Sequence, residues 1–190
     1  GEITIDGIDI GSVKIKSLRR QMGVMLQDSF IFSGTIMDNI RYGNMEATDE
    51  QVIEAAKTVR AHDFIRQLDN GYYTEVNERG SRLSVGQRQL ISFARALLAD
   101  PKILILDEAT SSIDTETEIL LQEGLSRLLA NRTSFIIAHR LSTIKNSDCI
   151  MYVDGGSIQE MGTHEELLEK KGYYYELYMS QYKFLEEGVS

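Results

Sequence analysis

The sequence has no tryptophan, one proline and one cysteine, and each scarcity excludes a class of protein. A single cysteine, Cys149, cannot form a disulfide within the chain, which excludes a small secreted domain held together by disulfides. Cys149 begins the apolar run that ends at Val153, so we expect a buried core thiol and a reducing, cytosolic compartment. One proline, with 42% hydrophobic residues, is typical of a folded domain and excludes a disordered chain.

Positive charge and long apolar runs are scarce as well. There are 20 Lys and Arg residues against 29 Asp and Glu, and the cations are scattered, so no nucleic-acid partner is expected. Apolar runs such as 103–106 are far shorter than the roughly twenty residues that span a bilayer, so we predict no membrane span here. The chain has no initiator Met and no leader, and it opens on a predicted strand, which indicates a segment of a longer protein.

Turn and cap signals divide the 190 residues, enough for one domain, into sheet and helical parts. The Asp-Gly pair at 6–7 lies between alternating stretches and predicts a hairpin, and Asp-Gly-Gly at 154–156 predicts a second one. Helical patterns run from about residue 34 to residue 98. The clearest helix there begins at Ser84, because Ser84 and Gln87 have capping-box spacing, and it ends before the single proline.

Short apolar runs alternate with helical patterns in the rest of the chain, which predicts a parallel sheet. The runs lie at 103–106, 134–138 and 149–153. A leucine pattern at 121–129 and a shorter helix near Leu141 separate them. Thr163 and Glu166 cap a further helix, and the tyrosine-rich tail is expected to be a packed amphipathic helix.

Two adjacent carboxylates follow the strand predicted at 103–106. Ligands of open α/β sheets bind at the carboxyl ends of the strands, where Asp107 and Glu108 stand. Asp107 can hold Mg²⁺, usually through water, and Glu108 can polarise a water that attacks a γ-phosphate. Alternatively, the pair only begins a solvated loop. The next run ends in His139, and a second polar strand end at the same edge favours a functional site.

The segment Leu-Ser-Val-Gly-Gln at 83–87 opens the long helix. It can be an ordinary N-cap made by Ser84 and Gln87. A helix N-terminus also presents free backbone N–H groups and a partial positive charge, and Gly86 allows close approach, so the segment is a candidate anion site. The two interpretations are compatible, because the cap creates the place where a phosphate can bind.

These motifs, in this order, resemble those of the ABC ATPases, and the resemblance covers essentially the whole chain. The segment 83–87 is similar to the family signature, 103–108 to the Walker B strand, Gln27 to the Q-loop glutamine, 111–114 to the D-loop and His139 to the H-loop histidine. The resemblance implies that Glu108 is the general base and that His139 contacts the γ-phosphate. It implies that Asp107 and Gln27 attend Mg²⁺. Contacts to the nucleotide are implied for Gln27, Ser84, Val85, Gly86, Gln87 and Asp114.

The fold implied by the resemblance is α/β: a partial RecA-like P-loop NTPase core with an inserted α-helical subdomain. Its N-terminal strands and P-loop are expected to be missing. Residues 1–27 and 101–190 are expected to form the remnant of the catalytic core, and residues 28–100 the helical subdomain that carries the signature.

Two further segments resemble the exporter branch of the family, namely 32–40 after the Q-loop and 74–80 before the signature. In the second, Glu78 is implied to face the coupling helices of a transmembrane domain. Asn77 departs from this pattern, because the exporter motif usually has glycine there. Both segments could instead be ordinary surface loops.

The sequence departs from the family at two places. A Walker A loop needs Gly-Lys followed by Ser or Thr, and no lysine here follows a glycine. That loop stabilises much of the charge in phosphoryl transfer, so we predict that the chain alone neither binds ATP tightly nor hydrolyses it. A missing central strand is expected to leave sheet edges that invite dimerisation, strand exchange or partial disorder. Val85 replaces a usual glycine but keeps its N–H and a helical φ, so we expect a working variant.

The implied function is that of the ATP-binding, ATP-hydrolysing region of an ABC exporter at the cytoplasmic face of the cell membrane, with these 190 residues themselves soluble. The implied cofactors are ATP and Mg²⁺. The implied partners are a second nucleotide-binding domain, in a homodimer or heterodimer, and the transmembrane domain of the same transporter. An alternative is a non-hydrolysing half that supplies only its signature to another subunit's ATP site, against which Glu108 and His139 argue. An ABC protein acting on ribosomes or DNA would need basic surfaces or coiled-coil insertions, and the sequence has neither.

Overall fold

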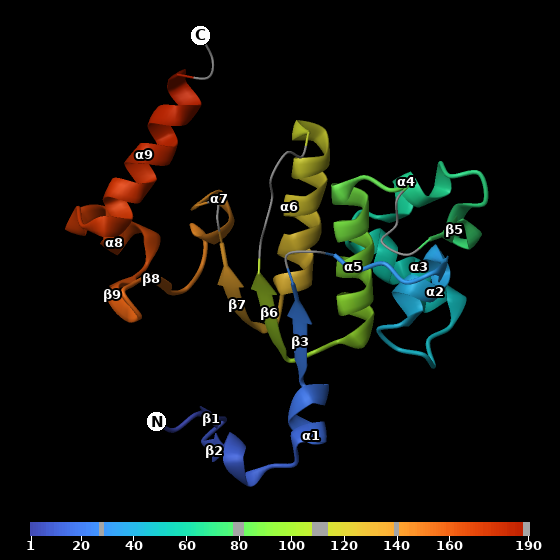
Figure 1. Ribbon diagram of the computed structural model, residues 1–190, viewed down its shortest axis with the longest axis horizontal. Coiled ribbons are helices and arrows are strands. Elements are labelled where there is room, and N and C mark those ends of the chain that lie inside the picture. Colours follow the sequence, from blue (N-terminus) through green and yellow to red (C-terminus); the bar gives the residue numbers. More distant parts are fainter. Residues whose placement is uncertain (27–28, 78–81, 108–113, 139–140, 188–190) are drawn as a thin grey trace. The chain divides into compact units, whose positions relative to one another are not determined.

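The computed structural model describes residues 1–26, 29–77, 82–107, 114–138 and 141–187 (Figure 1). The chain divides into two units, Gly1–Ile137 and Ala138–Ser190, and each is described by itself. In the described ranges, no helix is both long and apolar enough to cross a membrane.

The first unit contains strands, α-helices and two short 3-10 helices. In chain order these are β1 (Thr4–Ile5), β2 (Ile8–Asp9), η1 (Ile10–Ser12), α1 (Ile15–Arg20), β3 (Met22–Met25), β4 (Gly34–Thr35), α2 (Ile36–Arg41), α3 (Asp49–Thr58), α4 (His62–Arg66), η2 (Gly71–Tyr73), β5 (Glu75–Val76), α5 (Val85–Ala99), β6 (Ile103–Asp107), α6 (Thr115–Leu129) and β7 (Thr133–Ile137). The second unit contains α7 (Leu141–Ile144), β8 (Ile150–Asp154), β9 (Ser157–Gly162), α8 (His164–Lys170) and α9 (Tyr173–Glu187).

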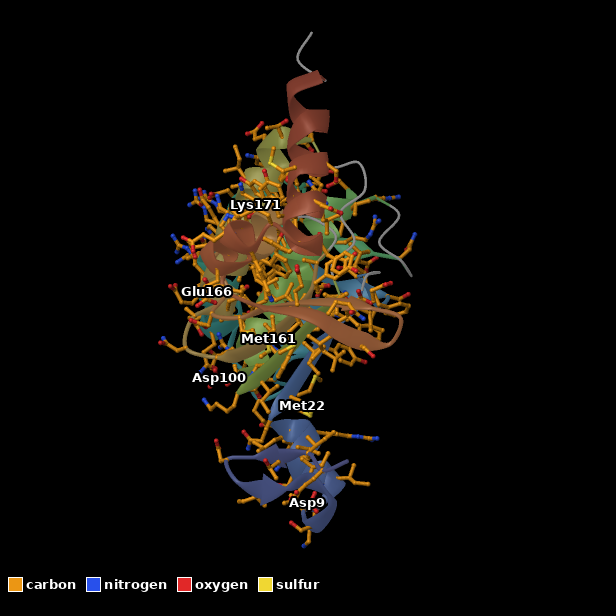
Figure 2. All side chains as sticks on the ribbon, turned by 90° about the vertical axis from the view of Figure 1, so that its left-hand side faces the viewer. Asp9, Met22, Asp100, Met161, Glu166 and Lys171 are labelled. Atoms are coloured by element: carbon orange, nitrogen blue, oxygen red, sulfur yellow. The ribbon has the colours of Figure 1, made fainter. Side chains whose placement is uncertain are left out.

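The hairpin predicted at the start of the chain is present. β1 pairs antiparallel with β2, and both turn residues have a positive φ, 50° at Asp6 and 76° at Gly7. A two-residue hairpin turn requires this conformation, which Asp and Gly tolerate. After β2, the Asp9 carboxylate (Figure 2) accepts a hydrogen bond from the Gly11 N–H and so begins η1.

The parallel sheet predicted from alternating strands and helices is also present, in the order β3-β6-β7. Successive side chains of a strand point to opposite faces. Leu104 and Leu106 of β6 are buried in the main core together with residues of α5 and α6, which lie beside the sheet in Figure 1. On the opposite face, Val24, Phe135 and Ile137 are 58%, 57% and 58% exposed. Among the described residues of this unit, helices therefore cover one face of the sheet and leave the other face bare.

Several helices of the first unit begin at N-terminal capping boxes. Capping boxes begin three of them, at Thr35 with Asp38, Thr48 with Gln51, and Ser84 with Gln87. The longest of these, α5, ends at Ala99. Asp100, which caps it, adopts a left-handed conformation with a φ of 44° immediately before the proline (Figure 2). This confirms the helix predicted from Ser84. The expected domain boundaries at residues 28 and 100 stay a prediction.

The second unit is built on the other predicted hairpin, β8 with β9, whose turn contains Gly155 and Gly156 at positive φ. The run at 149–153 was expected in the parallel sheet, and its strand instead pairs antiparallel with β9. α8 begins with the predicted capping box of Thr163 and Glu166, the latter labelled in Figure 2. α9 packs through Tyr174, which is 1% exposed and shares a small core with residues of α7, β8 and α8.

The prediction of a buried cysteine is wrong. Cys149 is exposed, and β8 begins one residue later, at Ile150. A two-stranded hairpin leaves one face open, and Met151 and Val153 on that strand are exposed too. The apolar run at 149–153 therefore predicts a strand correctly, but it does not predict that each of its residues is buried.

Candidate functional site

The site predicted at the sheet edge is organised by three strand ends. β3 ends at Met25, β6 at Asp107 and β7 at Ile137, and the register pairs Asp107 with Ile137. Because the strands are parallel, their carboxyl ends meet at one edge, where ligands of α/β sheets bind. Gln27, Glu108 and His139 follow these ends by one or two residues in sequence. They lie outside the described residues, as do Glu78 and the D-loop residues 111–113.

Asp107 is the part of the predicted magnesium site that the structure describes. It is the last residue of β6 and is half-buried. Among the described residues it forms no ion pair with a Lys or Arg, so its negative charge remains available for a cation. Nor do three described His, Cys, Asp or Glu side chains gather into a metal site of their own. Mg²⁺ is commonly held by one or two carboxylates together with water and phosphate oxygens, so Asp107 fits this ion.

The segment 83–87 forms a capped helix N-terminus with free donors. The Ser84 N–H donates to Gln87 Oε1 at 2.9 Å, and the Gln87 N–H donates to Ser84 Oγ at 3.2 Å. Within the described part of the chain, the N–H groups of Val85 and Gly86 have no partner, because the first turn of a helix lacks intrahelical acceptors. Free N–H groups and the helix dipole favour an anion here.

Val85 occupies the first helical position of α5 and is 47% exposed. It does not belong to the residues with positive φ, which confirms the helical backbone predicted for it. Its side chain therefore replaces a glycine without backbone strain.

Gly86 has a packing role that the sequence did not reveal. A Cβ atom at this position would overlap Thr117 Cγ2 and lie 3.6 Å from Leu121 Cδ1, both on α6. Gly86 itself is buried. The first turns of α5 and α6 therefore lie in direct contact, and only a residue without a side chain fits between them.

Asp114, the described end of the D-loop, caps α6 at the same place. Its Oδ1 accepts a hydrogen bond from the Thr117 N–H at 2.9 Å. The backbone hydrogen bond from Thr117 is the largest cause that lowers the pKa of Asp114 below its ordinary value of 3.8. The structure thus brings the signature segment and the D-loop aspartate to adjacent helix starts, which no sequence pattern had placed together.

A short ladder joins the two segments that resemble exporters. β4 pairs antiparallel with β5, with Gly34 opposite Val76 and Thr35 opposite Glu75. The Ile36 N–H also donates to Thr74 O at 3.2 Å. Residues that follow Gln27 by seven or eight positions are therefore bonded to residues that precede Glu78 by two or three.

The parallel sheet, with Asp107 at its carboxyl edge, and the free N–H groups of α5 define the class: an α/β domain that can bind an anionic ligand. The chain belongs to the ABC transporter family, whose model, described as "ABC transporter", matches residues 1–111. It is 58% identical over 182 residues to an uncharacterized ABC transporter ATP-binding protein, YknV, of Bacillus subtilis, covering 96% of this chain and 30% of that protein.

One relative with a named substrate and one solved structure agree with the exporter branch. The chain is 51% identical over 183 residues to the ATP-dependent lipid A-core flippase of Syntrophus aciditrophicus, covering 96% of this chain and 30% of that protein. A bacterial Atm1-family ABC exporter with ATP bound matches with a TM-score of 0.86 and 45% identity, covering 95% of this chain and 32% of that one. The chain thus spans less than a third of the length of these proteins.

Proposed function

We propose that this chain is the ATP-hydrolysing region of an ABC exporter, coupling hydrolysis to transport across a membrane. The observation that carries the proposal is the common edge at which β3, β6 and β7 end, immediately before Gln27, Glu108 and His139. Relatives that are exporters support the coupling to transport.

In this proposal Glu108 is the general base and His139 contacts the γ-phosphate. Asp107 and Gln27 would hold Mg²⁺, which neutralises phosphate charge when bound. Asp107 suits that task because it stands half-buried at a strand end with no described cation beside it.

The signature residues serve a second nucleotide-binding domain. Two such domains enclose two ATP molecules, and each site pairs one domain's strand-end residues with the other's segment 83–87. The free N–H groups of Val85 and Gly86, with Ser84, Gln87 and Asp114 beside them, supply the donors and contacts for that phosphate. Glu78 would face the transmembrane domain of the same transporter, at the cytoplasmic side of the membrane.

The 190 residues by themselves are not expected to bind ATP tightly. They contain no Gly-Lys followed by Ser or Thr, so the backbone cradle and lysine of a phosphate loop are not among them. They retain the groups that attack and sense the γ-phosphate, and need others to hold it.

The test compares purified full-length transporter, its Glu108→Gln variant and the isolated 190 residues. We expect Glu108→Gln to lower the ATPase rate by about 100-fold or more with ATP binding kept, because a general base contributes about 10² to 10⁴. The isolated residues should give neither heat of ATP binding nor phosphate release. Glu116→Gln, on the exposed first turn of α6, is the matched control and should hydrolyse ATP like the wild type.

Equal ATPase rates for wild type and Glu108→Gln would contradict the proposed base. A full-length protein that binds ATP without hydrolysing it would instead indicate the non-hydrolysing half, which supplies only its signature to another subunit.

A further inference from the structure

Arg95, on α5, donates hydrogen bonds to two backbone carbonyl groups and one side-chain amide of another segment. Its Nε donates to Asn39 O at 2.7 Å, its Nη1 to Phe30 O at 3.0 Å and its Nη2 to Asn39 Oδ1 at 3.0 Å. The guanidinium carbon also lies 5.1 Å from the centre of the Phe32 ring. One side chain therefore holds both ends of the segment 30–39.

Asn39 holds the interior of the same segment. It is 1% exposed, and its Nδ2 donates to Phe32 O at 2.9 Å and to Thr35 O at 3.0 Å. Its Oδ1 accepts from the Phe32 N–H at 2.9 Å as well as from Arg95. The segment is therefore fixed to α5 by a connected network of hydrogen bonds and not by apolar contact alone.

The directions of the Arg95 donors matter more to this network than the charge of its side chain. Burial lowers the pKa of Arg95, and no described Asp or Glu forms an ion pair with it. A planar fork with fixed donor directions suits several acceptors at once, which an ammonium cannot copy. The backbone of α5 is closely packed at this point too, because a Cβ at Gly43, just beyond α2, would overlap the backbone carbonyl oxygen of Arg95.

Arg95 lies between the predicted functional segments. It stands ten residues after Val85, or nearly three helical turns along α5 from the signature. Phe30, at the other end of the fork, comes three residues after Gln27. Thr35 in the same segment pairs with Glu75, ahead of Glu78.

We propose that Arg95 is a positioning residue that locks residues 30–39 to the signature helix, so that the two move as one body. The inference rests on the proposed function, in which the signature meets the partner's ATP and Gln27 attends this domain's own. Displacement of α5 at one ATP site would then be carried through Arg95 and Phe30 to Gln27 at the other.

The test uses full-length transporter with Arg95→Ala and Arg95→Lys. The matched control is Arg132→Ala. Arg132 has a side chain 9% exposed and likewise binds backbone carbonyls, of Pro101 at 3.1 Å and Leu128 at 2.7 Å, but at the opposite, amino-terminal edge of the sheet. Both changes remove a half-buried arginine, and Arg132→Ala also removes an ion pair with Asp100, so its general loss of stability should be at least as large. The melting temperature checks this.

Spin labels at Ser33 and Ala99, in a background without other cysteines, report the lock directly by their distance distribution. Both positions are exposed, one in the held segment and one at the end of α5. We expect one narrow distribution in the wild type and in Arg132→Ala, with and without ATP, and a broad one in Arg95→Ala. The kcat of Arg95→Ala should fall about tenfold with the KM for ATP within about twofold, since the binding groups remain. Arg95→Lys should be intermediate in both measurements.

A narrow distribution in Arg95→Ala overturns the proposal, as does an equal fall of kcat in Arg95→Ala and Arg132→Ala. A wild type without ATPase activity would refute the proposed function alone, because the label distances still decide whether the segment is locked.

Discussion

Gly86 shows how the signature segment is constrained by its neighbour across the helix interface. The structure places Thr117 Cγ2 where a side chain at Gly86 would begin. Its neighbour Val85 points outward and is 47% exposed. Two adjacent residues of one motif are therefore constrained differently. Position 86 admits no side chain, whereas the side chain at position 85 is largely free to vary as long as the backbone N–H is kept.

We expect Gly86→Ala to destabilise the chain. Overpacking costs about 1 to 3 kcal/mol and the better helix propensity of Ala returns about 1, so the free energy of unfolding should fall by up to about 2 kcal/mol. Urea unfolding at low protein concentration measures this. Val85→Ala, at the exposed neighbour, should stay within about 0.5 kcal/mol of wild type.

A second substitution identifies the atom responsible. Thr117→Ala removes the γ-methyl that the methyl group introduced by Gly86→Ala would meet, so in the double variant most of the loss should disappear. If Gly86→Ala is equally destabilising with and without Thr117, the clash is not its cause.

At single positions, the sequence predicted local hydrogen bonds better than it predicted which residues from elsewhere in the chain pack against a side chain. Ser84 and Gln87 were identified by their spacing, and their hydrogen bonds are as expected. Arg95 could not be, because its acceptors are carbonyl groups of residues 30 and 39, and every residue has a carbonyl. The error at Cys149 has the same origin, since burial depends on what packs against a strand.

At the scale of elements, signals contained within a few residues were reliable. The Asp-Gly turn of the first hairpin and the box of Thr163 with Glu166 each join residues that are close in sequence, and both formed as predicted. The β4–β5 ladder was missed, because two residues have no periodicity and the partners Thr35 and Glu75 are far apart in the chain. For the sheet-edge site, the sequence predicted which strands end in polar residues and in what order they follow one another. Asp107 stands at the end of β6, as expected.

The cap of α2 should make the stability of the chain depend on pH. The Thr35 hydroxyl and N–H donate to Asp38 Oδ2 at 2.6 and 3.1 Å, and these hydrogen bonds hold the pKa of Asp38 below its ordinary value of 3.8. Because the folded-state pKa is the lower one, the unfolded chain takes up the proton first as pH falls. The stabilisation is complete above pH 3.8 and is lost as pH drops through the folded pKa.

We therefore expect Asp38→Asn to be less stable than wild type at about pH 6, with a difference that shrinks as the pH approaches about 3. Denaturant midpoints across this range measure it. Asp69→Asn, at an exposed residue outside any helix cap, should follow the wild-type curve with a constant offset. A difference between Asp38→Asn and wild type that does not vary with pH would contradict the role of the carboxylate.

At the scale of the whole molecule, the bare face of the parallel sheet is the main liability of the 190 residues in isolation. Val24, Phe135 and Ile137 expose apolar surface on one face, and β3 and β7 are the outer strands of the sheet that the described residues form. Exposed apolar patches and unpaired strand edges favour association.

We expect the isolated chain to self-associate in a concentration-dependent manner, which sedimentation velocity measures. Phe135→Lys, on the outer strand β7 of that face, should shift the distribution toward monomer by adding charge where two copies would meet. Val153→Lys is the matched control, because Val153 is 62% exposed on the hairpin of the second unit. A wild-type chain that stays monomeric at all concentrations would contradict this expectation.

The first turn of the last helix, α9, is held by a residue of the strand β9, which precedes it in the chain. Glu160, 8% exposed on β9, accepts a hydrogen bond from the Tyr174 N–H at 2.9 Å in the first turn of α9. A Cβ at Gly172 would overlap that carboxylate, so the approach leaves no space for another residue. Isolated helices of this length are marginal in water. During synthesis β9 emerges before α9, so the carboxylate that holds the first turn of the final helix is already part of the chain when that helix is made.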